Sequence, residues 1–168
     1  MSRRRYIAWN QPMPASGANF TPTTTGTALK TMLQIKPTTN ISIIEWGYSF
    51  ATVPSVVIEC GLITTGTVAA TMATAHVASG VMPYDDAGAP ASSVSLATTA
   101  TAYAGAGTNT EGTTTSIRVL DFQEQWAQSY SKQFPLDREP GVIANDILRV
   151  RMNTTVAHSA LCYVIWEE

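Results

Sequence analysis

The clearest pattern in the chain is an alternation of apolar and polar positions in the segment ISIIEWGYSF, residues 41–50. One face would carry Ile44, Trp46, Tyr48 and Phe50, and the other Ile43, Glu45, Gly47 and Ser49. Successive side chains of a strand point to opposite faces of its sheet, so this period of two predicts a half-buried β-strand. The segment 55–63 repeats the pattern, with one face made of Val56, Ile58, Cys60 and Leu62.

Further strand-like segments follow at even spacing and are separated by turns. They are residues 28–36, 93–103, 115–123, 145–152 and 158–166, with a weaker candidate at 67–78. Loops rich in turn-forming residues lie at 80–92, 105–113 and 135–142. The segment 124–134 fits either a short helix, because Trp126 and Tyr130 are four residues apart, or another strand.

Eight or nine short strands with no long helix predict an all-β fold, and an eight- to nine-stranded jelly-roll sandwich is the architecture we expect. Thr, which is β-branched and suits a pleated sheet, supplies about one residue in seven. Residues 158–166 are apolar on both faces, which predicts a central strand. A length of 168 residues suits one domain. We expect that domain to span 28–168.

The segment 1–27 lacks the alternation and is rich in Pro, Gly, Ser and Thr, which is typical of irregular chain. It predicts an extended N-terminal docking arm. Arg3, Arg4 and Arg5 stand side by side, and Tyr6 and Trp9 follow at once. Arginine and aromatic residues are enriched at protein–protein contacts, so these five residues are the expected docking residues.

Charge is distributed unevenly along the chain. Residues 1–44 hold five basic and no acidic residues, whereas residues 45–168 hold five basic and twelve acidic residues, which gives the net charge of −2. An acidic body repels phosphate, so direct binding to nucleic acid is not expected. A basic end on an acidic body favours oriented docking on another protein.

Catalytic and cofactor-binding signatures are lacking in the sequence. There is no G-x-S-x-G motif, phosphate-binding loop or dinucleotide fingerprint. His158 and Cys162 are four residues apart, but four residues of a strand span about 13 Å, which argues against a shared metal. Acidic pairs at 85–86 and 137–139 suit turns and an exposed corner. We therefore predict a protein that is not an enzyme and uses no metal or cofactor.

Two cysteines and a set of aromatic residues have predicted structural roles. Cys60 and Cys162 each lie in an apolar strand-like segment, which predicts two buried, reduced thiols. Large aromatic side chains serve both protein cores and subunit interfaces. The residues expected in the core or in a trimer interface are Trp46, Tyr48, Trp126, Tyr163 and Trp166.

Several motifs occur in a recognisable order: ISIIEWGYSF, VVIECGLI, VMPYDDAGAPAS, FPLDREPGV, ILRVRM and VIWEE. With its start, MSRRRYIAWNQPMP, the chain resembles the capsid decoration (cement, or head-auxiliary) proteins of tailed phages that infect actinobacteria. The resemblance covers nearly the whole chain and rests on packing and corner motifs. It implies a jelly roll of the tumour-necrosis-factor-like kind. It also implies a homotrimer, made in the host cytoplasm, that sits on the exterior of the virion capsid with the major capsid protein as partner and without a membrane.

Two hypotheses about function follow, from different classes. The first is a structural cement protein whose arm, through Arg3, Arg4, Arg5, Tyr6 and Trp9, docks on acidic capsid surface and reinforces contacts between capsomers. The alternative is a receptor- or glycan-binding head of a tail or head fibre that uses loops 84–92 and 104–113. A free cytosolic binding domain is a third, weaker hypothesis. About 27 residues before the first expected strand are short for a fibre attachment, which favours cement.

Overall fold

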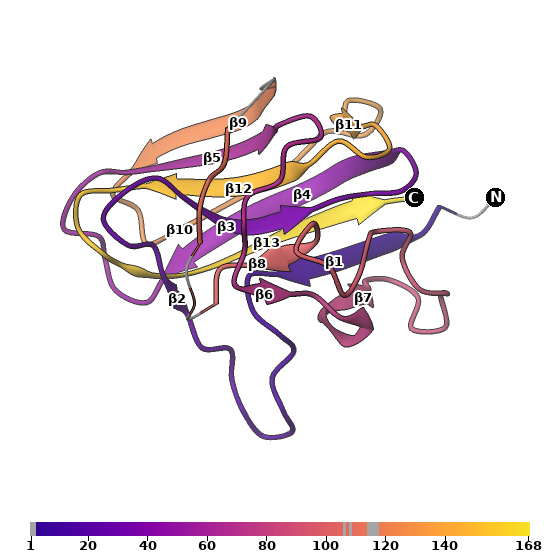
Figure 1. Ribbon diagram of the computed structural model, residues 1–168, viewed down its shortest axis with the longest axis horizontal. Coiled ribbons are helices and arrows are strands. Elements are labelled where there is room, and N and C mark those ends of the chain that lie inside the picture. Colours follow the sequence, from indigo (N-terminus) through magenta and orange to yellow (C-terminus); the bar gives the residue numbers. More distant parts are fainter. Residues whose placement is uncertain (1–2, 106, 108, 114–117) are drawn as a thin grey trace.

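The computed structural model describes residues 3–105, 107, 109–113 and 118–168. These residues form thirteen strands and one turn of 3₁₀ helix, η1 (Ala78–Gly80), and they contain no α-helix. The strands make two antiparallel sheets, of seven and six strands, that pack face to face as a sandwich (Figure 1). The expected all-β sandwich is therefore confirmed.

The seven-stranded sheet has the order β10-β4-β13-β1-β7, with β11 also paired to β4 and β2 also paired to β13. In chain order these strands are β1 (Arg5–Trp9), β2 (Thr23–Thr24), β4 (Ile41–Phe50), β7 (Val81–Pro83), β10 (Ser129–Gln133), β11 (Gly141–Val142) and β13 (Ser159–Glu167). The central place of β13, between β4 and β1, confirms the prediction made from its two apolar faces.

The six-stranded sheet has the order β6-β8-β3-β12-β5-β9. In chain order its strands are β3 (Lys30–Ile35), β5 (Ile58–Thr64), β6 (Thr74–Ala75), β8 (Ala102–Tyr103), β9 (Arg118–Gln125) and β12 (Leu148–Asn153). β9 therefore forms one edge of this sheet and β6 the other. Likewise, β10 and β7 end the seven-stranded sheet.

The main core lies between the two sheets and follows the alternation predicted from the sequence. In β5 the expected face is buried, because Ile58, Cys60 and Leu62 have no exposed surface. Facing side chains in the same core include Met32, Leu148, Val150, Ala160, Cys162, Val164 and Trp166. Burying such side chains contributes about 1.5–3 kcal/mol each, which is the main source of stability of the sandwich.

A β-bulge at Ile44 corrects the expected faces of β4. Ile43 and Glu45 pair with consecutive residues of β13, so Ile44 is an extra residue in the strand. Such a bulge shifts the alternation by one position. Ile43 consequently shares the core with Trp46, whereas Ile44 belongs to a small cluster on the outer face of the sheet. The expectation that Ile44 shares a face with Trp46 is wrong.

The segment 1–27 supplies two strands to the seven-stranded sheet. β1 lies between β13 and β7 and pairs with both, and β2 pairs with the start of β13. The expected boundary at residue 28 therefore does not separate β1 from the sandwich. The connection 10–22 does extend away from the body of the molecule (Figure 1). Arg4 lies beside the C-terminus, because the backbone N–H of Glu168 donates to its carbonyl at 2.9 Å.

Several local expectations also change. Residues 124–134 are not helical, because they contain the end of β9 and the strand β10. The segments 67–78 and 93–103 form only the two-residue strands β6 and β8. The loop 80–92 contains β7, and the corner 135–142 contains β11. Residues 115–117 of the strand expected at 115–123 lie outside the described residues.

Candidate functional site

Two of the three N-terminal arginines, Arg3 and Arg5, form ion pairs with acidic side chains. Arg3 Nη1 lies 3.2 Å from Glu167 Oε1, and Arg5 Nε lies 3.5 Å from Glu167 Oε2. Arg5 Nε also lies 4.0 Å from Asp85 Oδ2. The Arg3 side chain is 67% exposed, and its ion pair is of the kind that contributes little to stability. It remains available for docking, as does Arg4, which is also exposed.

Tyr6 and Trp9, the other two expected docking residues, have different surroundings. Tyr6 is only 1% exposed, its hydroxyl donates to the Pro90 carbonyl at 2.9 Å, and its ring stacks on Trp166. It is a core residue, because side chains alternate along β1 and this one points inward. Trp9 points outward and is half-buried against Phe20 and Tyr163. The five expected docking residues therefore do not form one exposed surface.

The five aromatic residues expected in a core or interface divide into three groups. Trp46, Tyr48 and Trp166 lie in the core between the sheets. Tyr163 lies on the outer face of the seven-stranded sheet, next to Trp9. Trp126 stands 65% exposed in the turn between β9 and β10. Only Trp126 and Tyr163 are therefore accessible enough to contribute to an interface.

Asp121 joins the edges of the two sheets. It lies on β9, is 8% exposed, and accepts hydrogen bonds from Trp46 Nε1 at 3.0 Å and from the Tyr130 hydroxyl at 2.8 Å. Lys132 Nζ lies 2.9 Å from its other carboxylate oxygen. Burial alone would raise the pKa of Asp121, but the hydrogen bonds from Lys132, Tyr130 and Trp46 outweigh it and hold the pKa below its usual range.

Glu111 fixes a loop over the outer face of the six-stranded sheet. Its carboxylate accepts from the Thr31 hydroxyl at 2.9 Å and lies 3.4 Å from Nη1 of Arg149 and 3.7 Å from Nη1 of Arg151. Arg149 has no exposed surface, and it also donates to the carbonyls of Glu111 and Val68. The described part of the loop 104–113 is thus held on the sheet, although it had been expected to be free for ligand binding.

The uncovered part of the same face carries an apolar surface that we call the apolar strip. Its exposed members are Leu29, Val119 and Phe122, which lie around the buried side chain of Ile63. Val119 is 60% exposed and Phe122 is 49% exposed, which is high for large apolar side chains on a sheet face. Glu59, Arg151 and Asn153 border the strip and line the same shallow pocket of about 180 Å³. An apolar centre with a polar rim is the anatomy of a protein–protein contact.

The apolar strip could not be found by alternation alone. Val119 pairs with Ile63 and Phe122 pairs with Gly61, with a bulge between them that lets both side chains reach the outer face. The available signal was the apolar content of both faces of the segment TSIRVLDFQ, residues 115–123. In an edge strand, an apolar outer face indicates contact with another molecule.

The cysteines are confirmed as free, buried thiols. Burial raises the pKa of Cys60 to about 12 and the pKa of Cys162 well above its usual value. A thiol with so high a pKa is not a nucleophile near neutral pH, because the thiolate is the reactive form.

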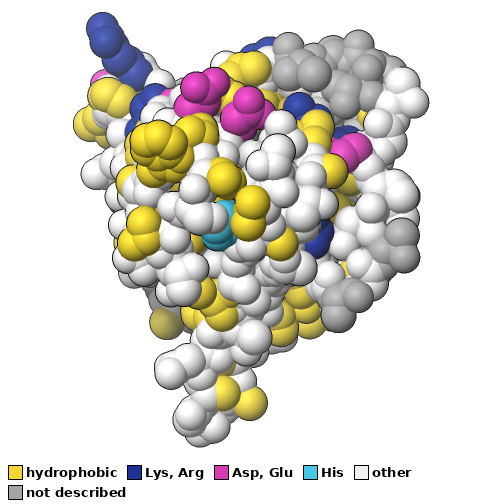
Figure 2. Space-filling model, turned by 90° about the vertical axis from the view of Figure 1, so that its left-hand side faces the viewer, with side chains coloured by type: hydrophobic (Ala, Val, Ile, Leu, Met, Phe, Trp, Pro, Cys, Tyr) yellow, Lys and Arg dark blue, Asp and Glu magenta, His cyan; other side chains and the backbone are white. Residues whose placement is uncertain are grey.

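Charged groups and metal-binding chemistry are sparse in the described part of the chain. The side drawn in Figure 2 carries scattered hydrophobic side chains among uncharged polar atoms, and few charged ones. Among the described residues, no group of three or more His, Cys, Asp and Glu side chains is placed to hold a metal ion. The described residues also include no helix long and apolar enough to cross a membrane.

Three comparisons with known proteins complete the description of the chain. No family model, no curated protein and no solved structure matches it.

Proposed function

We propose that this protein is a non-enzymatic structural component of a bacteriophage virion that binds the outside of the capsid and reinforces contacts between capsomers. The major capsid protein is its partner in this proposal. The sandwich is a jelly roll of the tumour-necrosis-factor-like kind, and the protein acts as a homotrimer. The resemblance of the sequence motifs to phage decoration proteins supports the proposal, as does the all-β sandwich.

The apolar strip is the observation that carries the proposal. It exposes Val119 and Phe122 on β9, which pairs along its length with β5, and β5 in turn pairs with β12. Such a surface can dock without losing much conformational freedom, because its side chains already stand on a rigid sheet. The neighbouring Glu59 and Arg151 supply the polar rim that sets orientation.

Because β1 pairs within the sandwich, the N-terminal segment is not a free docking arm in this proposal. Tyr6 and the backbone of β1 belong to the sandwich, so a deletion of residues 2–9 would remove a central strand and unfold the protein. The accessible positive charge is that of Arg3 and Arg4. We assign these two residues to electrostatic attraction toward acidic capsid surface, and the apolar strip to the contact itself.

A co-sedimentation experiment with capsids that lack this protein tests the proposal. Phe122→Asp places a charge in the apolar strip, and we expect at least about tenfold weaker binding at every salt concentration. Val77→Asp is the matched control, because Val77 is an equally exposed apolar residue beside β6, at the opposite edge of the sheet. The double variant Arg3→Glu, Arg4→Glu should weaken binding chiefly at low salt.

Two results would contradict the proposal. One is equal binding by the Phe122→Asp and Val77→Asp variants, which would remove the apolar strip from the contact. The other is density for the protein at the tail tip rather than at local threefold positions of the capsid in images of intact virions. The trimer itself is tested by light scattering, which should give three times the chain mass of 18.0 kDa.

A further inference from the structure

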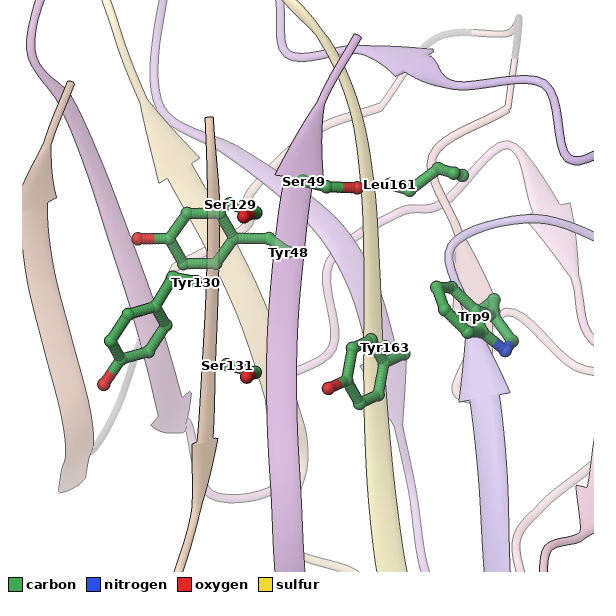
Figure 3. Close-up of a pocket in the computed structure, with 8 residues that line it drawn as sticks. All are labelled: Trp9, Tyr48, Ser49, Ser129, Tyr130, Ser131, Leu161 and Tyr163. Carbon is green, nitrogen blue, oxygen red and sulfur yellow. The ribbon is translucent and has the colours of Figure 1, made fainter. Parts of the chain in front are cut away.

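A groove lies on the outer face of the seven-stranded sheet, on the side of the sandwich opposite to the apolar strip. Its volume is about 350 Å³, within the range of small-molecule sites. Figure 3 shows Trp9 and Tyr163 on the neighbouring strands β1 and β13, and Ser129 and Ser131 on β10. Ser49 of β4 and Leu161 of β13 also line the groove, as do Tyr48 and Tyr130, which pack in or against the core between the sheets.

Strand register creates the shape of the groove. Ser131, Gly47, Tyr163 and Trp9 form one row across four strands, and Ser129, Ser49 and Leu161 form the next row. Residues on the β10 and β4 side are small, and those on the β13 and β1 side are large. The groove therefore has a floor formed by the hydroxyls of Ser49, Ser129 and Ser131. Beside it stands what we call the aromatic wall, formed by the rings of Trp9 and Tyr163.

The aromatic wall is held in place by its own contacts. The Trp9 ring lies 4.8 Å from the Tyr163 ring and 5.0 Å from the Phe20 ring, measured between centroids. The Tyr163 hydroxyl donates to the Glu45 carboxylate. Tyr163 also leans over Gly47, where a Cβ atom would come within 2.8 Å of the tyrosine ring. A wall fixed in this way loses little side-chain entropy when a ligand packs on it.

The chemistry of the lining restricts the ligand. None of the lining side chains is charged, and the neighbouring Glu45 carboxylate already accepts from the Tyr163 hydroxyl, so the groove offers no positive charge to an anionic ligand. Serine hydroxyls donate and accept hydrogen bonds, and a wholly apolar ligand would cover them without offering a partner. Aromatic ring faces are electron-rich and attract the slightly positive C–H groups of a saturated ring. A ligand with both C–H faces and hydroxyl groups satisfies the floor and the wall together.

We propose that this groove binds a neutral carbohydrate, with a pyranose ring stacked on Trp9 and its hydroxyl groups bonded to Ser49, Ser129 and Ser131. This site lies on the sheet face and differs from the loops 84–92 and 104–113 that the sequence suggested for glycan binding. It goes beyond capsid docking and uses none of the residues of the apolar strip.

The test is an NMR titration of the ¹⁵N-labelled protein with neutral saccharides: methyl glucoside, methyl galactoside, methyl mannoside, N-acetylglucosamine, maltose and cellobiose. The chain has four tryptophans, and the indole N–H signal of Trp9 is identified by its loss in Trp9→Phe. We expect at least one saccharide to shift the Trp9 signal at millimolar concentration, with the signals of the buried Trp46 and Trp166 unchanged.

Three variants make the result specific. Trp9→Ala removes the stacking surface and should weaken saccharide binding about tenfold, and Trp9→Phe should bind more tightly than Trp9→Ala. Both variants lack the Trp9 indole signal, so their binding is followed by the backbone amide signals of Ser49, Ser129 and Ser131. Ser131→Gln enlarges an exposed side chain beside the groove, leaves the fold undisturbed, and should also weaken binding. Phe122→Ala, on the opposite face, should bind saccharide like the unaltered protein.

The proposal is overturned if no saccharide of the panel shifts the Trp9 signal. It is also overturned if Ser131→Gln and Phe122→Ala bind equally well, because the site would then lie elsewhere. Failure of the capsid proposal is distinguishable, because Phe122→Asp and Val77→Asp would then bind capsids equally well, whether or not a saccharide shifts the Trp9 signal. Shifts of the Trp9 signal by an added peptide but by no saccharide would also count against a carbohydrate site.

Discussion

Removal of the Asp121 carboxylate should destabilise the sandwich more than any other change at its open edge. Asp121 lies on β9 of one sheet and accepts hydrogen bonds from Trp46 and Tyr130 of the other sheet. The perturbation is Asp121→Ala. The matched control is Glu124→Gln, which changes an exposed acid on the same strand.

The expected loss of stability depends on whether water can replace the carboxylate as hydrogen-bond partner of each residue that contacts Asp121. Trp46 is fully buried, so its indole N–H would lose its acceptor without gaining water, which costs about 1–3 kcal/mol. Tyr130 and Lys132 are partly exposed, and water would replace the carboxylate for both, so each adds only about 0.5 kcal/mol. We expect the free energy of unfolding to fall by about 3 kcal/mol for Asp121→Ala and by about 1–2 kcal/mol for Asp121→Asn, which keeps an acceptor.

Urea denaturation followed by tryptophan fluorescence measures these differences, and Glu124→Gln should change the free energy of unfolding by less than about 0.5 kcal/mol. The pKa of Asp121 is lowered in the folded protein, so its contribution is complete above the unfolded value of 3.8 and is lost as the pH falls through the folded value. The difference between the protein and Asp121→Asn should therefore shrink in acid. Equal stability of Asp121→Ala and Glu124→Gln at neutral pH would refute this account.

Three further predictions concern other buried sites. Burial lowers the pKa of His76 from 6.5 to about 4, so the free energy of unfolding should fall by about 3 kcal/mol between pH 6.5 and pH 4, and urea titrations of His76→Gln should lack this part of the fall. Gly47→Ala should cost about 1–3 kcal/mol, because its Cβ would lie 2.8 Å from the Tyr130 carbonyl oxygen. Thermal melts of both variants measure this, and Gly61→Ala should lower the stability less, because the nearest atom to its Cβ would be 3.4 Å away. Glu111→Ala should leave Arg149 poorly paired and speed hydrogen exchange at Thr71 and Thr110, whose backbones bond to each other, with no change of exchange in β4.

The long strands could be predicted because burial of one face imposes the alternation that the sequence displays. β4 spans the ten residues that the pattern indicated, and β5 buries the predicted face. The bulge at Ile44 could not be predicted, because it depends on pairing with β13, which is more than a hundred residues away. The short strands β2, β6, β8 and β11 are likewise set by their partners rather than by their own two residues.

The N-terminal strand shows why composition misled the prediction for residues 1–27. Arginines and prolines surround the five residues of β1, so no alternating segment long enough to be recognised is present. Its partners, β13 and β7, come much later in the chain. The Asp121 network was hidden for the same reason, since Trp46 and Asp121 are 75 residues apart. The row of Ser131, Gly47, Tyr163 and Trp9 also exists only once four strands are in register.

The two outer faces of the sandwich suit different partners, and their opposite positions make the two proposals compatible. The six-stranded sheet presents a shallow apolar surface, which suits another protein, because area and shape rather than hydrogen bonds would drive that contact. The seven-stranded sheet presents a hollow with hydroxyl groups, which suits a small polar ligand. A protein docked on a capsid through the apolar strip would turn the groove toward the surrounding medium. Decorated capsids should therefore bind the same saccharide as the free protein, and the Ser131→Gln variant should bind it more weakly while still decorating the shell.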